Sequence, residues 1–276
     1  MTTNRSIALN QDAELLGLLS QAEDEDLGLL VEYLTPRRER RGTRSRVQRT
    51  LIKARGHGCY PHAVRVLMLT ELMQVADNRI LRLLRKEGEP SYLDVVRDVA
   101  RHFKLVPEEG EKPEALEARI LEKLVEQAWG RMNEAERSAV GSAWGVGGGG
   151  AQPQALSSAL RVLQMGGFAA YRIALFTAHA LAQSLTGRGL SEAGQATIHH
   201  ALASLSGPVV WALTAVWTVF DLASPSYRIT VPCVIQIAYM RQKQSVNICP
   251  ACRAPNDKGA RFCNQCGGPV SRPQVP

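Results

Sequence analysis

The chain has 276 residues, of which 45% are hydrophobic and 5% aromatic, and it carries a formal net charge of +7. This length suits one large or two modest domains with a small module, and the scarcity of aromatic residues argues against a β-sandwich or barrel. Met1 to Gln11 shows no sustained apolar stretch and no cleavage pattern, so we expect no secretory signal. The composition therefore predicts a mainly α-helical, cytoplasmic protein.

Residues 13–34 show the spacing of amphipathic helices. Leucines recur in two groups, 15–19 and 27–34, on either side of the acidic residues 23–26. Acidic side chains are favourable at the positive end of a helix dipole. The acidic break is therefore predicted to begin a second helix.

The positive charge is concentrated between residues 37 and 55. Nine basic residues stand there against one acid, Glu39, which gives this run a net charge of +8 and leaves the rest nearly neutral. Such a run can bind a phosphate polymer or an anionic membrane face, or it can be a solvated helix surface and loop. The arginines proposed to bind an anionic partner lie in its first two thirds: Arg37, Arg38, Arg40, Arg41, Arg44, Arg46 and Arg49.

A turn-rich segment, Gly56 to His62, follows the basic run. Its residues His57, Cys59 and His62 could make a thiol nucleophile with a base, or a second metal site. A catalytic cysteine needs an oriented histidine, and a metal site needs further ligands. Neither is evident in the sequence, so we expect a polar turn, and we find no set of catalytic residues in the chain.

Helical periodicity returns in residues 64–84, 91–103 and 113–129, with Ser91 placed to cap the second of these helices. In the third, apolar residues recur every four positions and form one seam: Leu116, Ile120, Leu124 and Ala128. The glycine run 145–150 lacks a preceding apolar strand and a following Lys-Ser or Lys-Thr pair, so it is predicted to be a hinge and not a phosphate loop. This places a charged helical region at 1–144 and the hinge at 145–154.

An apolar helical domain is predicted at residues 155–241. Residues 156–185 favour one or two helices, loosened at Gly166-Gly167, and a short helix follows at 191–205. Pro208 to Phe220 then carries no charge and no polar stripe, so it must be enclosed by other helices or by lipid. It is shorter than the roughly 20 apolar residues that span a bilayer, which favours the interior of a helical bundle.

A second apolar run, 229–240, is predicted to pair with this helix as a buried hairpin. Thr230 is placed to cap it, and Pro232 is placed in its first turn. Asp221 and Arg228 stand on either side of the intervening turn and could form an ion pair across the mouth of the hairpin.

The C-terminal segment 247–270 carries the most specific motif. Two Cys-x-x-Cys pairs are separated by ten residues: Cys249, Cys252, Cys263 and Cys266. This spacing brings four thiolates around one metal, and zinc fits best. Disulfides would require an oxidising compartment, and a redox pair would favour a strand–helix fold. We therefore predict a zinc ribbon, closed to catalysis because its four positions are filled by sulfur.

Four stretches carry a family resemblance: residues 26–35, 92–100, 166–171 and 207–232, the last with Trp217-Thr218 and Pro225 to Pro232. In them the chain resembles the bacterial YaaW-like family, whose members are often labelled ubiquinol–cytochrome c chaperone-like. The resemblance covers most of residues 13–241 and is most specific in the last stretch. It implies an α-helical protein without an agreed activity. The cysteine tail is an addition to the family's usual body, and the basic run is not matched to it.

The leading hypothesis is a non-enzymatic helical adaptor or chaperone-like protein that docks a macromolecular partner, expected to be a protein, through its zinc ribbon. The second is a membrane-active protein whose apolar hairpin enters lipid on a trigger, which would bring it to the surface of the inner membrane. The third is nucleic-acid binding through Arg37–Arg55, placed last because the run lacks aromatic residues for base stacking.

Overall fold

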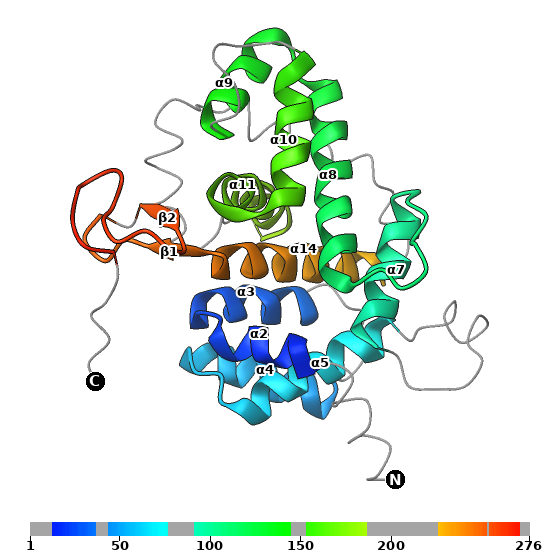
Figure 1. Cartoon of the computed structure of the whole chain (residues 1–276). Helices are drawn as coiled ribbons and strands as arrows, with labels where there is room; N and C mark the ends of the chain where they lie inside the picture. The colour runs from blue at the N-terminus through cyan, green and yellow to red at the C-terminus, as the bar shows by residue number, and fades with distance from the viewer. Residues whose placement is uncertain are drawn as a thin grey trace. The chain divides into compact units, whose positions relative to one another are not determined.

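The protein is mainly α-helical, as predicted, with one small sheet near its C-terminus (Figure 1). The computed structural model describes residues 13–36, 44–76, 91–144, 153–186, 226–252 and 254–270. Contacts divide the chain into two compact units, Met1–Glu117 with Asp221–Ile237, and Ala118–Phe220 with Ala238–Pro276. The domain limits predicted from the sequence stay a prediction, and the glycine run 145–150 lies outside the described residues.

The first unit is a bundle of short helices. Its described helices are α2 (Ala13–Gln21), α3 (Asp24–Leu34), α4 (Arg46–His57), α5 (His62–Ala76) and α7 (Tyr92–His102). Helix α8 (Pro113–Arg131) begins in this unit, and α14 (Tyr227–Gln244) lies in it as far as Ile237. Helix α4 packs against α3 and α5, and α5 also contacts α2, α3 and α7 (Figure 1). Aliphatic side chains with no exposed surface form the core: Leu19, Leu27, Val31, Leu34, Leu51, Val96 and Val99.

The second unit contains α9 (Glu134–Trp144), α10 (Pro153–Met165), α11 (Gly167–Thr186) and the sheet. Helix α10 packs against α9 and α11, and α11 also contacts both strands. Between α10 and α11, Gly166 and Gly167 have φ angles of 73° and 83°, in the left-handed region that glycine adopts without a steric penalty. The predicted loosening at these glycines is therefore a break between two helices.

Local sequence signals account for several helix boundaries. The acidic residues 24–26 form the first turn of α3, as predicted. Ser91 caps α7 reciprocally, because its hydroxyl accepts a hydrogen bond from the backbone of Asp94, whose carboxylate accepts one from the backbone of Ser91. The predicted seam of α8 is buried throughout: Leu116, Ile120, Leu124 and Ala128.

The second arm of the predicted hairpin is α14 (Tyr227–Gln244), most of which is buried. It begins three residues before the predicted cap: Ser226 provides the first accepting carbonyl, and the Thr230 hydroxyl donates to it at 3.1 Å. Pro232 consequently lies inside the helix and not in its first turn.

The first arm, Pro208 to Phe220, and Asp221 lie outside the described residues, so the ion pair with Arg228 stays a prediction. Among the helices that are described, none combines the length and the apolar character that crossing a bilayer requires.

Candidate metal centre

The four cysteines are held by a small sheet and two tight turns. Strands β1 (Val246–Ile248) and β2 (Pro255–Asp257) pair antiparallel, with Ile248 opposite Pro255, and the turn between them carries Cys249 and Cys252. The second pair, Cys263 and Cys266, follows β2 on a loop closed by a bridge between Phe262 and Pro269. Both Cys-x-x-Cys turns therefore have a fixed backbone.

The four sulfur atoms lie within 4.8 Å of one another. The Sγ atoms of Cys249 and Cys266 are 3.6 Å apart, as are those of Cys252 and Cys263. A zinc ion with four sulfur ligands at about 2.3 Å requires sulfur–sulfur separations of about 3.8 Å, whereas a disulfide requires about 2.05 Å. The cluster therefore fits a tetrahedral metal, as the sequence predicted, and all six cysteines of the chain are free.

Backbone amides surround the sulfur atoms. The backbone N–H of Cys266 is the main cause that lowers the pKa of Cys263 to about 6, and the backbone N–H of Cys252 lowers the pKa of Cys249. The backbone N–H of Ala254 lowers the pKa of Cys252, but burial and the neighbouring sulfurs outweigh it and raise that pKa to about 12. The backbone N–H groups directed at Cys249 and Cys263 favour the thiolate form, which is the form that binds a divalent cation.

Asn256 links the two turns, and sequence reasoning missed it. Its side chain is 1% exposed, and its amide donates to the carbonyl of Ala254 at 2.8 Å and to the sulfur of Cys263 at 3.6 Å. Its carbonyl oxygen accepts a hydrogen bond from the backbone of Asn264 at 2.9 Å. In the sequence Asn256 is only an asparagine between the two cysteine pairs, and that position alone does not predict a hydrogen bond to a cysteine.

The apolar interior of the ribbon is formed largely by the cysteines themselves. The buried cluster consists of Cys249, Ala254, Cys263 and Val270, with Cys252 packed against it. Two small aliphatic side chains bury too little surface to stabilise an independent fold. The metal would hold the two turns together, and binding energies of roughly 10–16 kcal/mol are typical for structural zinc.

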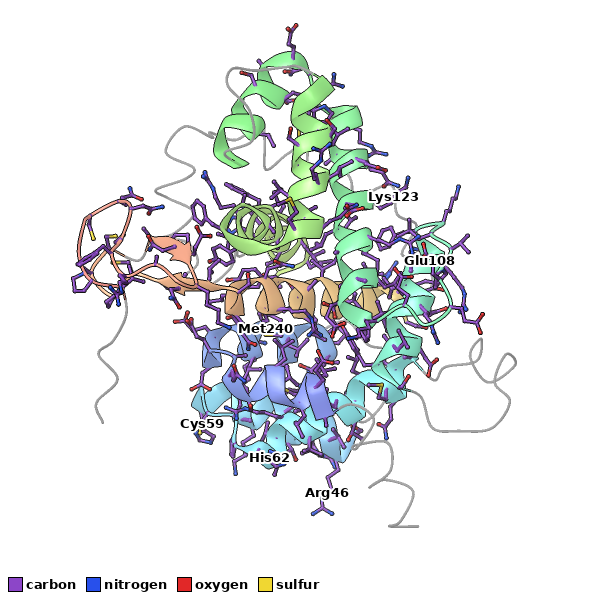
Figure 2. The ribbon with its side chains drawn as sticks, viewed as in Figure 1. Arg46, Cys59, His62, Glu108, Lys123 and Met240 are labelled. Carbon is purple, nitrogen blue, oxygen red and sulfur yellow. The ribbon has the colours of Figure 1, made fainter. Side chains whose placement is uncertain are left out.

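The other residues singled out in the sequence do not join this centre. His57 ends α4, His62 begins α5 and Cys59 lies in the turn between them, and all three are exposed. Figure 2 shows Cys59 and His62. The four cysteines form the one group with metal-binding geometry among the described residues. Cys233 is completely buried in α14, where burial raises the pKa of its thiol well above its usual value.

Three of the seven arginines predicted to bind an anion lie within the described residues. Arg44, Arg46 and Arg49 are exposed, and the remaining four lie outside the described residues: Arg37, Arg38, Arg40 and Arg41.

The chain is similar to bacterial proteins whose names state no activity. It is 30% identical over 230 residues to a UPF0174 protein of Helicobacter pylori strain J99, covering 83% of this chain and 90% of the relative. A second UPF0174 protein of that strain is 27% identical over 179 residues, covering 63% of this chain and 85% of the relative. The UPF0174 protein YaaW of Escherichia coli K12 is 28% identical over 182 residues, covering 65% of this chain and 71% of the relative. No family model and no solved structure matches.

Proposed function

The chain belongs to the UPF0174 family, and from this premise we propose that it is a non-enzymatic helical adaptor that docks a protein partner through a zinc ribbon at residues 247–270. The family supplies no activity, so the proposal depends on the chemistry of the ribbon. Four sulfur ligands leave no coordination position for water or substrate. A metal bound there is structural, and its effect is to fix the surface that surrounds it.

Phe262 is the observation that carries the docking proposal. Its ring is 67% exposed on the loop that holds the second cysteine pair, next to the exposed Arg261. Aromatic and arginine side chains are enriched among the residues that contribute most to protein interfaces. Because the bridge to Pro269 and the adjacent cysteines fix the loop, little conformational entropy is lost when a partner covers the ring.

Metal content tests the first half of the proposal. We expect one zinc per purified chain by elemental analysis, lost on Cys263→Ser. Cys59→Ser is the matched control, because Cys59 is exposed and lies outside the cluster. A zinc content unchanged by Cys263→Ser would overturn the ribbon assignment.

Site-specific crosslinking tests the second half. A photoreactive amino acid at position 262 should capture a discrete protein in the native host, whereas the same amino acid at Val106, which is 79% exposed in the first unit, should not. With the captured protein purified, Phe262→Ala should weaken binding about 30-fold, the effect of losing about 2 kcal/mol at an interface hot spot.

Val106→Ala should leave that affinity unchanged. Equal affinities of the wild type and the Phe262→Ala variant, in zinc-loaded protein, would exclude docking through this ring.

A further inference from the structure

Helix α4 presents a line of basic side chains on one exposed face. Arg46, Arg49, Lys53 and His57 are all exposed and follow one another at intervals of three, four and four residues. These intervals place side chains on the same side of a helix. We call these four residues the α4 basic stripe; Figure 2 shows the side chain of Arg46, its first member, extending outward from the helix.

The opposite side of α4 is engaged within its own unit. Leu51 and Ala54 are buried, and Nη2 of Arg55 lies 2.6 Å from Oε2 of Glu32 on α3. Gln48 donates a hydrogen bond to the buried Glu71 on α5 at 2.8 Å. The helix therefore divides the basic run: Arg55 is held by an acid of the bundle, whereas the α4 basic stripe faces solvent.

No acidic residue occurs within α4, so its own sequence does not neutralise the stripe. Arg49 donates from Nη1 to the carbonyl of Arg44 at 2.7 Å, which orients its guanidinium and leaves its other N–H groups for a ligand. At about 1.5 Å per residue, the stripe extends roughly 16 Å, the length over which one DNA strand carries about five phosphates.

The residue composition of this face distinguishes between two kinds of anionic partner, a membrane surface and a nucleic acid. A helix that rests in a membrane surface buries apolar side chains in the lipid, but in α4 Leu51 and Ala54 are buried in the protein and Val47 and Ile52 are half-buried. Its exposed residues are Arg46, Arg49, Thr50, Lys53, Gly56 and His57, none of them a large apolar or aromatic side chain. Arginine forks suit phosphate oxygens, and without an aromatic ring the face cannot stack on bases.

We propose that the α4 basic stripe binds the phosphate backbone of a nucleic acid, without base specificity. Within the Arg37–Arg55 run predicted from the sequence, the proposal selects Arg46, Arg49 and Lys53, leaves out Arg55 and adds His57, which follows the run. It does not depend on the metal centre. Affinity for a duplex should be electrostatic, so it should fall steeply with salt.

Fluorescence anisotropy of the zinc-loaded full chain with a labelled mixed-sequence DNA duplex of about 20 base pairs tests the proposal. The variant Arg46→Gln/Arg49→Gln/Lys53→Gln removes three cations. We expect this variant to bind the duplex at least tenfold more weakly than the wild type at about 50 mM salt. The slope of log affinity against log salt concentration should be shallower by about 2.7, because each of three lost phosphate contacts contributes about 0.9.

Two controls separate the stripe from overall charge. Arg55→Gln removes a cation of the same helix that already has a partner, and Lys104→Gln/Arg161→Gln/Lys258→Gln removes three exposed cations from other elements. Both should keep the wild-type salt slope. Circular dichroism verifies that each variant is folded.

Three outcomes would overturn the proposal. The wild type could fail to bind the duplex at low salt, or the dispersed triple variant could lose as much affinity as the stripe variant. Sedimentation with phosphatidylglycerol vesicles is the third arm: stripe-dependent binding to vesicles without binding to the duplex would assign the stripe to a lipid surface.

Discussion

Asn256 is the buried polar side chain on which the order of the two cysteine turns depends. Replacing it with alanine removes the donor to Cys263 and leaves the backbone N–H of Asn264 without its partner, whereas the carbonyl of Ala254 keeps the hydrogen bond from the backbone of Cys249. Groups that hold metal ligands in place typically contribute 10–100-fold to affinity. We expect Asn256→Ala to weaken zinc binding by this factor in a competition titration with a chromophoric chelator.

Asn247→Ala is the matched control for that measurement. Asn247 lies on β1, directly opposite Asn256, but its side chain donates to the carbonyl of Lys258 at 2.6 Å and bonds to no cysteine. The zinc affinity of the Asn247→Ala variant should stay within about a factor of two of the wild-type affinity. Equal losses in both variants would mean that Asn256 acts on the sheet and not on the sulfur atoms.

Gly28 lies where α3 passes close to a buried tyrosine. A Cβ atom at this position would be 3.0 Å from the hydroxyl oxygen of Tyr60, which is 3% exposed. Because the ring has little room to move, we expect Gly28→Ala to lower the free energy of unfolding by about 1–3 kcal/mol in urea denaturation.

For Gly17 on α2 we expect the opposite effect of an alanine substitution on stability. A Cβ atom there would meet nothing within 4 Å, so Gly17→Ala should raise the free energy of unfolding by about 0.5–1 kcal/mol through helix propensity alone. A destabilised Gly17→Ala variant would show that backbone effects, and not the contact with Tyr60, explain the first result.

Among the elements, α7 owes its start to one serine. Ser91→Ala removes the acceptor for the backbone N–H of Asp94. N-cap replacements of this kind lower stability by about 1 kcal/mol, which chemical denaturation can measure. Ser20→Ala, which removes an exposed hydroxyl bonded to the carbonyl of Gly17, should change stability by less than about 0.5 kcal/mol.

The elements that the sequence predicts well are those with a local signal. The four-residue period of the α8 seam, the Ser91 cap and the spacing of the cysteine pairs each lie within a short window. The seam and the cap are confirmed in the structure, and the four cysteines cluster at distances compatible with a metal, whereas zinc itself stays a prediction. Helix α9 was missed although Asn133 and Glu136 exchange hydrogen bonds at its start. Its apolar residues do recur at helical intervals, but three of the five are alanines, which give only a weak hydrophobic signal: Ala135, Ala139, Val140, Ala143 and Trp144.

The remaining features depend on contacts between residues distant in sequence. Asn256 acquires its role from Cys263 and Asn264, seven and eight positions away. Arg55 is separated from the other cations of the basic run by Glu32 on another helix. Neither set of partners can be read from a local pattern. The early start of α14 is a local feature that was predicted wrongly, because Thr230 and Pro232 imitate a helix start whereas the carbonyl of Ser226 accepts the first hydrogen bonds.

For the whole molecule, removal of the metal should act on the ribbon and spare the helices. The ribbon's buried cluster is made largely of its ligands, whereas the first unit has an aliphatic core of its own. After chelation we expect amide hydrogens of residues 246–270 to exchange rapidly while α2 to α5 keep their protection, as measured by mass spectrometry. Simultaneous loss of protection in α3 would show that the bundle also depends on the metal.

The buried interior of the ribbon consists largely of its own metal ligands. The order of this segment would therefore depend on how much zinc the cell takes up. With zinc bound as proposed, the fraction of chains with an ordered ribbon would follow the ratio of free zinc to its dissociation constant, so zinc scarcity would leave residues 246–270 open to cellular proteases. A bacterium starved of zinc would then accumulate clipped molecules that keep the helical body, and refeeding would restore intact ones only through new synthesis.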